Sequence, residues 1–281
     1  MARMNESART AAARGLAFLK AQHAGLEAAI VDCLWFHGDP QAVVGALKRF
    51  QNDDGGFGKR LEVDIAAPES NPFATRLALG YLRDIPRQAG AELLGSVGPW
   101  LRENQALDGD WHFSEATRAG ELAPWFAAWT FPSLNPACCL AGLATALDIA
   151  TPEMVERVGV LFAAQASVET VRTGEFYDLV PYIEYSLTGS LPVDYVDAIA
   201  ETITRWARED RFEDAEHFFN LAFGGSAELS ARIPAELVEG FVARALAEQL
   251  DDGGWPTPYD PAWRPAATVG VLRALARAVR E

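Results

Sequence analysis

The sequence predicts an all-α fold in which about twelve helices form six consecutive pairs. The motif Gln-x-x-Asp-Gly-Gly-aromatic occurs at 51–57 and 249–255, and a variant with Asp110 in place of the second glycine occurs at 105–111. Each copy follows an amphipathic helical stretch and precedes a loop and a small, apolar stretch with helical periodicity. No segment shows the alternation expected of a strand.

The six pairs follow one another along the chain. They occupy 8–22 with 26–38, 41–50 with 70–82, a helix ending at Gln105 with 134–147, 155–165 with 176–189, 196–210 with 214–225, and 237–249 with 264–279. Two second helices begin alike, with Asn71-Pro72 and Asn135-Pro136. We expect asparagine N-caps with proline at the first helical position.

The two helices of a pair differ in character, which predicts how they are arranged. The first carries charged residues on one face, such as Lys48 and Arg49, as an outer helix does. The second is apolar nearly all round, as an inner helix that is buried on most sides should be. Since neither terminal pair has a clearly polar capping face, the pattern predicts a closed (α/α)6 toroid, or barrel, with concentric inner and outer rings in a single domain, residues 1–281.

The repeated motif itself is interpreted as a structural clasp. In the first copy, Gln51 and Asp54 tie the helix end to the following turn, Gly55 permits the chain reversal and Phe57 anchors the turn by packing. The adjacent Asp53 and Asp54 are therefore not interpreted as a metal site.

Composition limits the partners and the compartment. A formal net charge of −15 with no long basic run argues against nucleic acid and anionic membranes as partners. No leader or run of eighteen apolar residues is present, so we expect no membrane span and a cytoplasmic location. The three cysteines show neither a disulfide framework nor a metal knuckle, and no cofactor motif is found. The sequence leaves the oligomeric state open.

The clasp motifs resemble the repeats of the terpenoid-cyclase and protein-prenyltransferase superfamily, whose α/α toroids carry Gln-x-x-x-Gly-x-Trp and DGGF or DGGW variants. The resemblance covers essentially the whole chain and implies the toroid. It implies no particular reaction, because the DxDD and DDxxD motifs of the cyclases are absent. Asp32, Cys33 and His37 match the residue types of the prenyltransferase zinc ligands but lack their context, so we expect no metal.

Acidic residues cluster in the loop 58–70, here called the acidic loop. Glu62, Asp64 and Glu69 precede an expected inner helix. A half-buried carboxyl there is suited to general acid–base catalysis, and Asp64 and Glu62 are catalytic candidates. Glu69 is a ligand-binding candidate. Alternatively, the three acids neutralise nearby basic residues and cap the helix.

Aromatic residues cluster in the loop 113–136, here called the aromatic loop. Trp125, Trp129 and Phe131 are candidates for stabilising a cation or stacking on a ring. The alternative is ordinary packing.

Three further helices contribute candidates. Asp178, Tyr182 and Tyr185 are about one helical turn apart and share a face, on which Asp178 is a third catalytic candidate. Tyr182, Tyr185, His217 and Trp263 are ligand-binding candidates. For the face with Asp178 and for His217, the alternative is a structural role with all hydrogen bonds satisfied.

These candidates predict an enzyme or binding protein that holds an apolar or cyclic small molecule in the central cavity and acts by acid–base chemistry. A carbohydrate-active barrel with paired carboxylates is the second hypothesis. A non-catalytic scaffold is the third.

Overall fold

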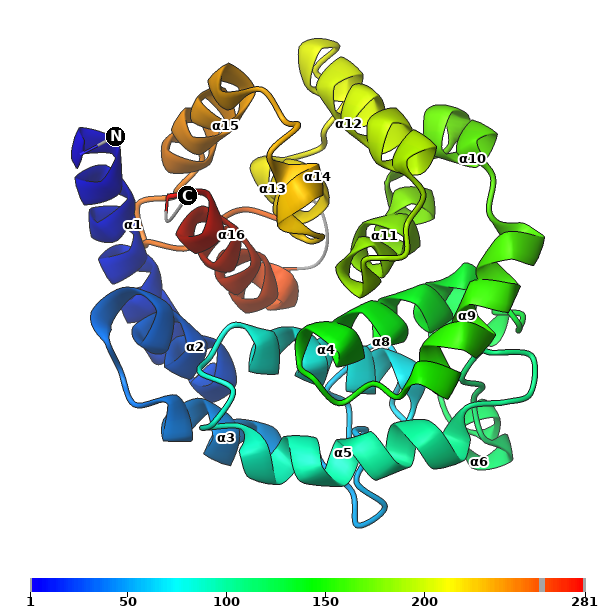
Figure 1. Cartoon of the computed structure of the whole chain (residues 1–281). Coiled ribbons are helices and arrows are strands. Elements are labelled where there is room, and N and C mark those ends of the chain that lie inside the picture. Colours follow the sequence, from blue (N-terminus) through cyan, green and yellow to red (C-terminus); the bar gives the residue numbers. More distant parts are fainter. Residues whose placement is uncertain (1, 258–260, 280–281) are drawn as a thin grey trace. The chain divides into compact units, whose positions relative to one another are not determined.

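The computed structural model describes residues 2–257 and 261–279. Within these residues it contains sixteen α-helices, two short 3-10 helices and no β-strand (Figure 1). The prediction of an all-α fold is confirmed.

The chain divides into two compact units, described separately below. Unit 1 comprises Met1–Val43 and Asp197–Glu281, and unit 2 comprises Val44–Val196. The chain leaves unit 1 within α3 (Pro40–Lys48) and returns within α12 (Val193–Arg208). That the chain forms a single domain stays a prediction.

Unit 1 is built around its last helix. Its other elements are α1 (Ala2–Ala21), α2 (Gly25–Phe36), α13 (Ala215–Phe223), α14 (Ala227–Ser230), α15 (Ala235–Ala247), η2 (Pro261–Trp263) and α16 (Arg264–Ala278). α16 packs against α1, α2, α13 and α15. Its larger aliphatic residues, Val269, Val271, Leu272 and Leu275, are buried.

Unit 2 is built around α8. Its elements are α4 (Pro72–Arg83), α5 (Ala91–Asn104), α6 (Glu115–Ala119), α7 (Pro124–Ala127), α8 (Leu134–Ala146), α9 (Pro152–Gln165), α10 (Val168–Thr173), α11 (Phe176–Tyr185) and η1 (Ser186–Thr188). α8 contacts α4, α9 and α11. Every residue from 136 to 144 is buried, which confirms that this helix is apolar all round.

All twelve expected helices are present. The four additional α-helices (α6, α7, α10 and α14) have only four to six residues each and lie in connecting segments. Asn71 caps α4 as expected, because its side chain accepts the Ala74 amide N–H at 2.9 Å. Asn135 lies inside the bounds of α8 but has extended backbone angles (φ −107°, ψ 116°), as an N-cap residue has. Its side chain differs from that of Asn71, because its Oδ1 accepts from the Cys139 thiol at 3.6 Å.

The three glutamine motifs form the same hydrogen bonds. Gln249 Nε2 donates to the carbonyl oxygen of Gly253, in its own turn, and to that of Ala11 in α1, both at 2.8 Å. The corresponding bonds run from Gln51 to Gly55 and Leu93 in α5, and from Gln105 to Gly109 and Met154 in α9. Each motif therefore ties its turn to the first helix of another pair, namely α1, α5 or α9.

The first glycine of each motif closes the same contact. Gly253 has φ of 91°, and a Cβ on it would overlap the carbonyl oxygen of Arg14, three residues after Ala11. In the same way, a Cβ on Gly55 would overlap the carbonyl oxygen of Ser96, and a Cβ on Gly109 that of Arg157. Each of these residues also comes three positions after the residue whose carbonyl the glutamine binds. The clasp interpretation is confirmed. In all three copies the motif also holds the turn against a second helix, through the hydrogen bonds of the glutamine and the close contact of the first glycine.

Candidate functional site

The acidic and aromatic loops of unit 2 are joined by backbone pairing. Ile65 and Leu122 form an isolated antiparallel bridge. The Ala123 amide donates a hydrogen bond to the carbonyl oxygen of Asp64 at 2.9 Å. Two loops that the sequence analysis treated separately therefore form one structural feature at the start of α4, and Asp64 lies beside Trp125.

Glu62 is a half-buried carboxyl with few neutralising contacts. Its Oε1 accepts the amide N–H of Asp64 at 3.3 Å. Burial raises the pKa of Glu62, and the negative charge of Asp64 raises it further, whereas that amide hydrogen bond and the charge of Arg76 lower it. The net shift is upward, so Glu62 retains its proton to a higher pH than an ordinary glutamate.

Asp64 also has a raised pKa. Burial is the main cause, and hydrogen bonding to the Trp125 side chain opposes it. The surface beside the two carboxyls is apolar: Val63 is 45% exposed and Trp125 is 57% exposed. Exposed side chains of this size beside a pair of acids are suited to contacting a ligand.

Arg76 and Glu184 form an ion pair next to Glu62. Arg76 is on α4 and Glu184 is on α11, and the guanidinium donates two hydrogen bonds to the carboxylate, both at 2.8 Å. The side chains are only 24% and 16% exposed. Burial lowers the pKa of Arg76, but the charge of Glu184 and its hydrogen bonds, with a smaller effect of Glu62, more than offset this, so the guanidinium stays positive.

Cys139 of α8 lies against the same pair. Burial is the main reason that the pKa of its thiol is raised well above the ordinary value, and the nearby Glu184 carboxylate adds to this. A thiol held in its neutral form is a poor nucleophile. Cys139 is completely buried and packs beside the ion pair.

We call Glu62, Asp64, Trp125, Arg76 and Glu184 the acidic site. The first three were candidates from the sequence. Arg76 and Glu184 were missed, since they come from helices more than a hundred residues apart in sequence. The available signal was the acid Glu184 within the otherwise uncharged stretch 179–185.

The remaining aromatic candidates of the aromatic loop are packed. Phe126, Trp129 and Phe131 belong to one cluster with Phe73 and Phe113, with ring centroids of contacting pairs 4.7 to 6.1 Å apart. This matches the packing alternative for Trp129 and Phe131. Only Trp125 of the three candidates is exposed.

The candidates on α11 have structural contacts. Asp178 is exposed and accepts the Glu175 amide N–H at 2.8 Å, which closes a capping box at the start of the helix. Tyr182 and Tyr185 are buried and pack against Phe162, with ring centroids 5.7 and 4.6 Å away. The structure does not bring Asp178 to the acidic site.

Glu69 lies at the end of the acidic loop, half-buried. Its Oε2 is buried and has no hydrogen-bond partner among the described residues. Among the described residues, no hydrogen bond or ion pair links Glu69 to Glu62 or Asp64, so Glu69 is not included in the acidic site.

A second group of titratable side chains lies on α13 in unit 1. His217 Nδ1 and Asp214 Oδ1 are 2.7 Å apart, and this pairing offsets the effect of burial and raises the pKa of His217. Burial, with repulsion from Asp214, raises the pKa of Glu216 to about 7, although hydrogen bonding to Asn220 opposes it. Trp263 is half-buried before α16, and nothing places it with this group.

Asp110 is the polar residue that the clasp interpretation underestimated. It is completely buried, and burial raises its pKa to about 7. Its two carboxylate oxygens accept the amide N–H groups of Trp111 and Ser133 at 2.7 and 2.8 Å. The residue therefore fastens the end of the aromatic loop to the second clasp.

No three His, Cys, Asp or Glu side chains in the described ranges are grouped closely enough to hold a metal ion, and this includes Asp32, Cys33 and His37. Among the same residues, none of the helices has the length and apolar character needed to cross a membrane.

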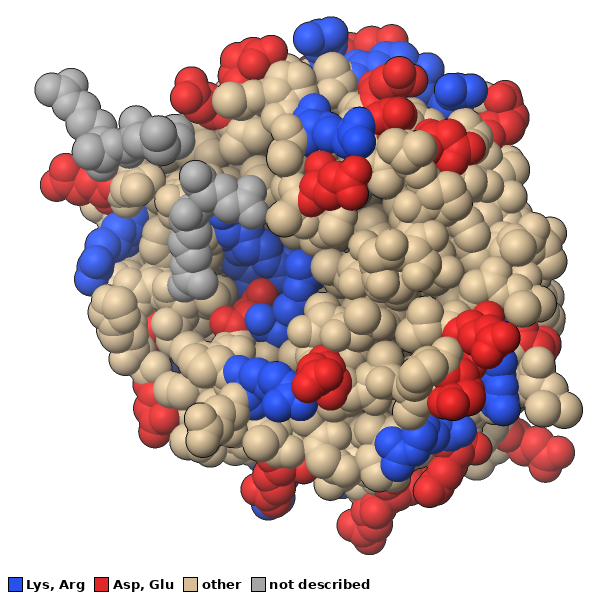
Figure 2. Space-filling model, in the orientation of Figure 1, with Lys and Arg blue, Asp and Glu red and all other residues tan. Residues whose placement is uncertain are grey.

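Figure 2 shows acidic and basic side chains interspersed over the visible face. Comparisons with known protein families, curated proteins and solved structures find no significant match.

Proposed function

We propose that the chain is an enzyme that acts on an apolar or cyclic small molecule by acid–base chemistry, with Glu62 and Asp64 as its catalytic carboxyls. The observation that carries the proposal is the acidic site. Two adjacent carboxyls with raised pKa lie beside the exposed apolar side chains of Val63 and Trp125.

Each residue has a role in this proposal. Glu62 donates a proton to the substrate, and the carboxylate that forms is stabilised by the positive charge of Arg76. Asp64, as a carboxylate, accepts the proton that the resulting cation loses. Trp125 offers its ring face to a cyclic substrate or to a developing cation. The pairing with Glu184 fixes the Arg76 side chain, so its charge is in place before reaction.

The proposal extends to the fold and family. We place the site in an (α/α)6 toroid, a single domain of residues 1–281 similar to those of the terpenoid cyclases and protein prenyltransferases. Six helix pairs and three equivalent clasps support it. The clasp from Gln249 to Ala11 ties the last outer helix to the first, which is a contact that a closed ring requires. In this arrangement the ligand occupies the central cavity.

The paired carboxyls support a second candidate, a carbohydrate-active enzyme. Glu62 and Asp64 are two residues apart, and Trp125 is an exposed platform of the kind on which sugars stack. Glycoside hydrolysis uses two carboxyls that flank the scissile bond, about 5 Å or about 6.5–9.5 Å apart. One carboxyl then protonates the leaving oxygen, and the other acts as nucleophile or base.

One experiment distinguishes the two candidates. The protein is incubated with a panel of apolar alkenes, epoxides and cyclic ketones and a panel of oligosaccharides, in heavy water and in water labelled with heavy oxygen. Proton transfer to carbon incorporates deuterium, whereas glycoside hydrolysis incorporates heavy oxygen at the released sugar end. Mass spectrometry reads both.

Label in the apolar panel that is lost in Glu62→Gln supports the first candidate. Heavy oxygen in the sugars supports the second and overturns the first. Label in neither panel, from a protein with a cooperative unfolding transition, favours the non-catalytic scaffold and overturns both. Glu103→Gln, at an exposed position on α5, is the matched control.

A further inference from the structure

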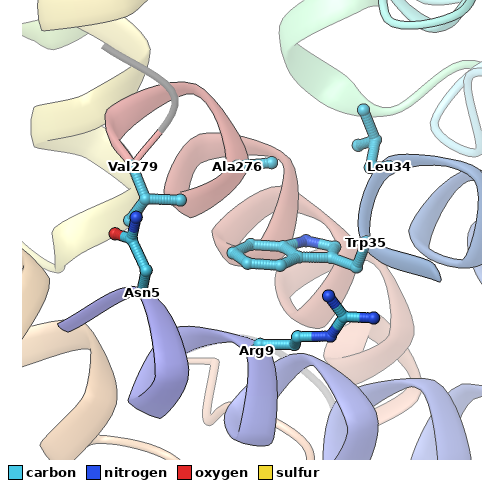
Figure 3. Close-up of a pocket in the computed structure, with 6 residues that line it drawn as sticks. All are labelled: Asn5, Arg9, Leu34, Trp35, Ala276 and Val279. Carbon is cyan, nitrogen blue, oxygen red and sulfur yellow. The ribbon is translucent and has the colours of Figure 1, made fainter. Parts of the chain in front are cut away.

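A cavity in unit 1, which shares no residue with the acidic site, lies among α1, α2 and α16. Its volume is about 210 Å³ (Figure 3). These three helices pack against one another pairwise. The cavity is lined by Asn5, Arg9, Leu34, Trp35, Ala276 and Val279. Three different helices thus contribute to one pocket that is open to solvent on one side.

Trp35 forms the fixed wall of this cavity. Its indole N–H donates a hydrogen bond to the carbonyl oxygen of Leu272 on α16, at 3.0 Å. In Figure 3 the ring lies between the Arg9 side chain and Ala276. Because the N–H is already bonded, what the ring offers a ligand is its apolar surface.

Arg9 and Asn5 place polar groups at the edge of the cavity. Both side chains are exposed, so they mark the side that opens to solvent. The Arg9 guanidinium stacks on the Phe36 ring, 5.7 Å from its centroid, which positions it without using its N–H donors. In the described ranges no acidic side chain forms an ion pair with Arg9, and Glu6, one turn away on α1, is not paired with it.

We propose that this cavity binds a small carboxylate with a flat apolar body. The guanidinium of Arg9 has the planar fork that matches a carboxylate. The body of the ligand lies against Trp35, Leu34 and Ala276. An apolar cavity of roughly 150 Å³ accepts a benzene ring, so this volume fits one ring with its carboxylate.

The test uses benzoate as the probe and benzyl alcohol as its neutral counterpart of similar shape. Binding to the full chain is measured by calorimetry or ligand-observed NMR. Arg9→Gln removes the charge at an exposed position, and Ala276→Leu fills the cavity. Arg102→Gln, an exposed arginine of unit 2, is the control. The unfolding midpoint of every variant shows that it is folded.

We expect benzoate to bind the unaltered chain, and to bind at least about tenfold more weakly to Arg9→Gln and to Ala276→Leu. Arg102→Gln keeps full affinity, and benzyl alcohol binds more weakly than benzoate. No binding to the unaltered chain at about 10 mM benzoate overturns the proposal, as does equal affinity in Arg9→Gln. A chain shortened by residues 280–281 serves as a further control, and we expect it to bind benzoate with the same affinity as the full chain. If only the shortened chain binds benzoate, residues 280–281 compete for the cavity and the proposal is contradicted.

Discussion

Arg76 and Glu184, 108 residues apart in sequence, are joined by two parallel hydrogen bonds between α4 and α11. Both side chains are largely buried, so removing either partner leaves a charge without its counter-ion. Glu184→Gln is expected to lower the free energy of unfolding by about 3 kcal/mol. Urea denaturation measures this.

The double variant Arg76→Met with Glu184→Leu is the matched comparison. It removes both charges, so it should be destabilised less than Glu184→Gln alone. A double variant that is destabilised by the sum of two large single effects would contradict a buried, mutually compensating pair.

Alanine substitutions at two glycines with positive φ distinguish the cost of backbone strain from the cost of steric overlap. Gly253→Ala is expected to cost about 3 kcal/mol or more, because φ is 91° and a Cβ would overlap the Arg14 carbonyl. Gly189→Ala has φ of 72° but open space, and is expected to cost about 1–2 kcal/mol.

Gly240→Ala completes this series in α15, where a Cβ meets nothing within 4 Å and helix propensity favours alanine. It is expected to stabilise the chain by about 0.5–1 kcal/mol. Thermal or urea unfolding ranks the three variants. Equal effects at Gly253 and Gly189 would show that the contact with α1 contributes nothing.

The local features of the fold were predictable because they depend on near neighbours in the sequence. Helical periodicity indicated all twelve long helices, and the repeated glutamine motif indicated the clasps. Asn71 was recognisable as a cap from its Asn-Pro context. Asn135 has the same context and extended backbone angles, but its side chain accepts from the Cys139 thiol.

The site was only half predictable, since it depends on long-range contacts. Glu62 and Asp64 were recognisable as acids before an inner helix. Their pairing with Trp125, and the approach of Arg76, depend on how the loops and helices pack. For Asp178 the sequence predicted a catalytic role, because helical spacing put it on one face with Tyr182 and Tyr185. In the structure its carboxylate instead accepts the Glu175 amide N–H and caps the start of α11.

Two neighbouring aromatic residues on α7 are expected to respond differently to truncation. Phe126 is 7% exposed within the aromatic cluster, so Phe126→Ala should lower the free energy of unfolding by about 3 kcal/mol. Trp125 is 57% exposed, so Trp125→Ala should change it by less than about 1 kcal/mol while weakening ligand binding. Equal destabilisation by both changes would contradict the description of Trp125 as a ligand surface.

Glu216 makes stability depend on pH. Its pKa is raised from 4.5 to about 7 on folding, so the folded state binds more protons than the unfolded state between these values. Its contribution is fully present below about pH 4.5 and is lost as pH rises through about 7, with an upper limit of about 3 kcal/mol.

Glu216→Gln mimics the protonated form and should flatten this part of the profile. Urea unfolding at about pH 5 and about pH 8 measures the difference between the variant and the unaltered chain. His217 contributes with the same sign, because its pKa is also raised, so the profile of the variant is not expected to be completely flat. Identical slopes would show that Glu216 is not held in its neutral form.

The most direct test of the account is the rate of label incorporation by Glu62→Gln relative to Glu103→Gln, in the substrate that the panel identifies. If Glu62 is the proton donor of the acidic site, the variant loses at least about 100-fold in rate while its unfolding midpoint is nearly unchanged. A Glu62→Gln protein that incorporates label as fast as Glu103→Gln would contradict the assignment.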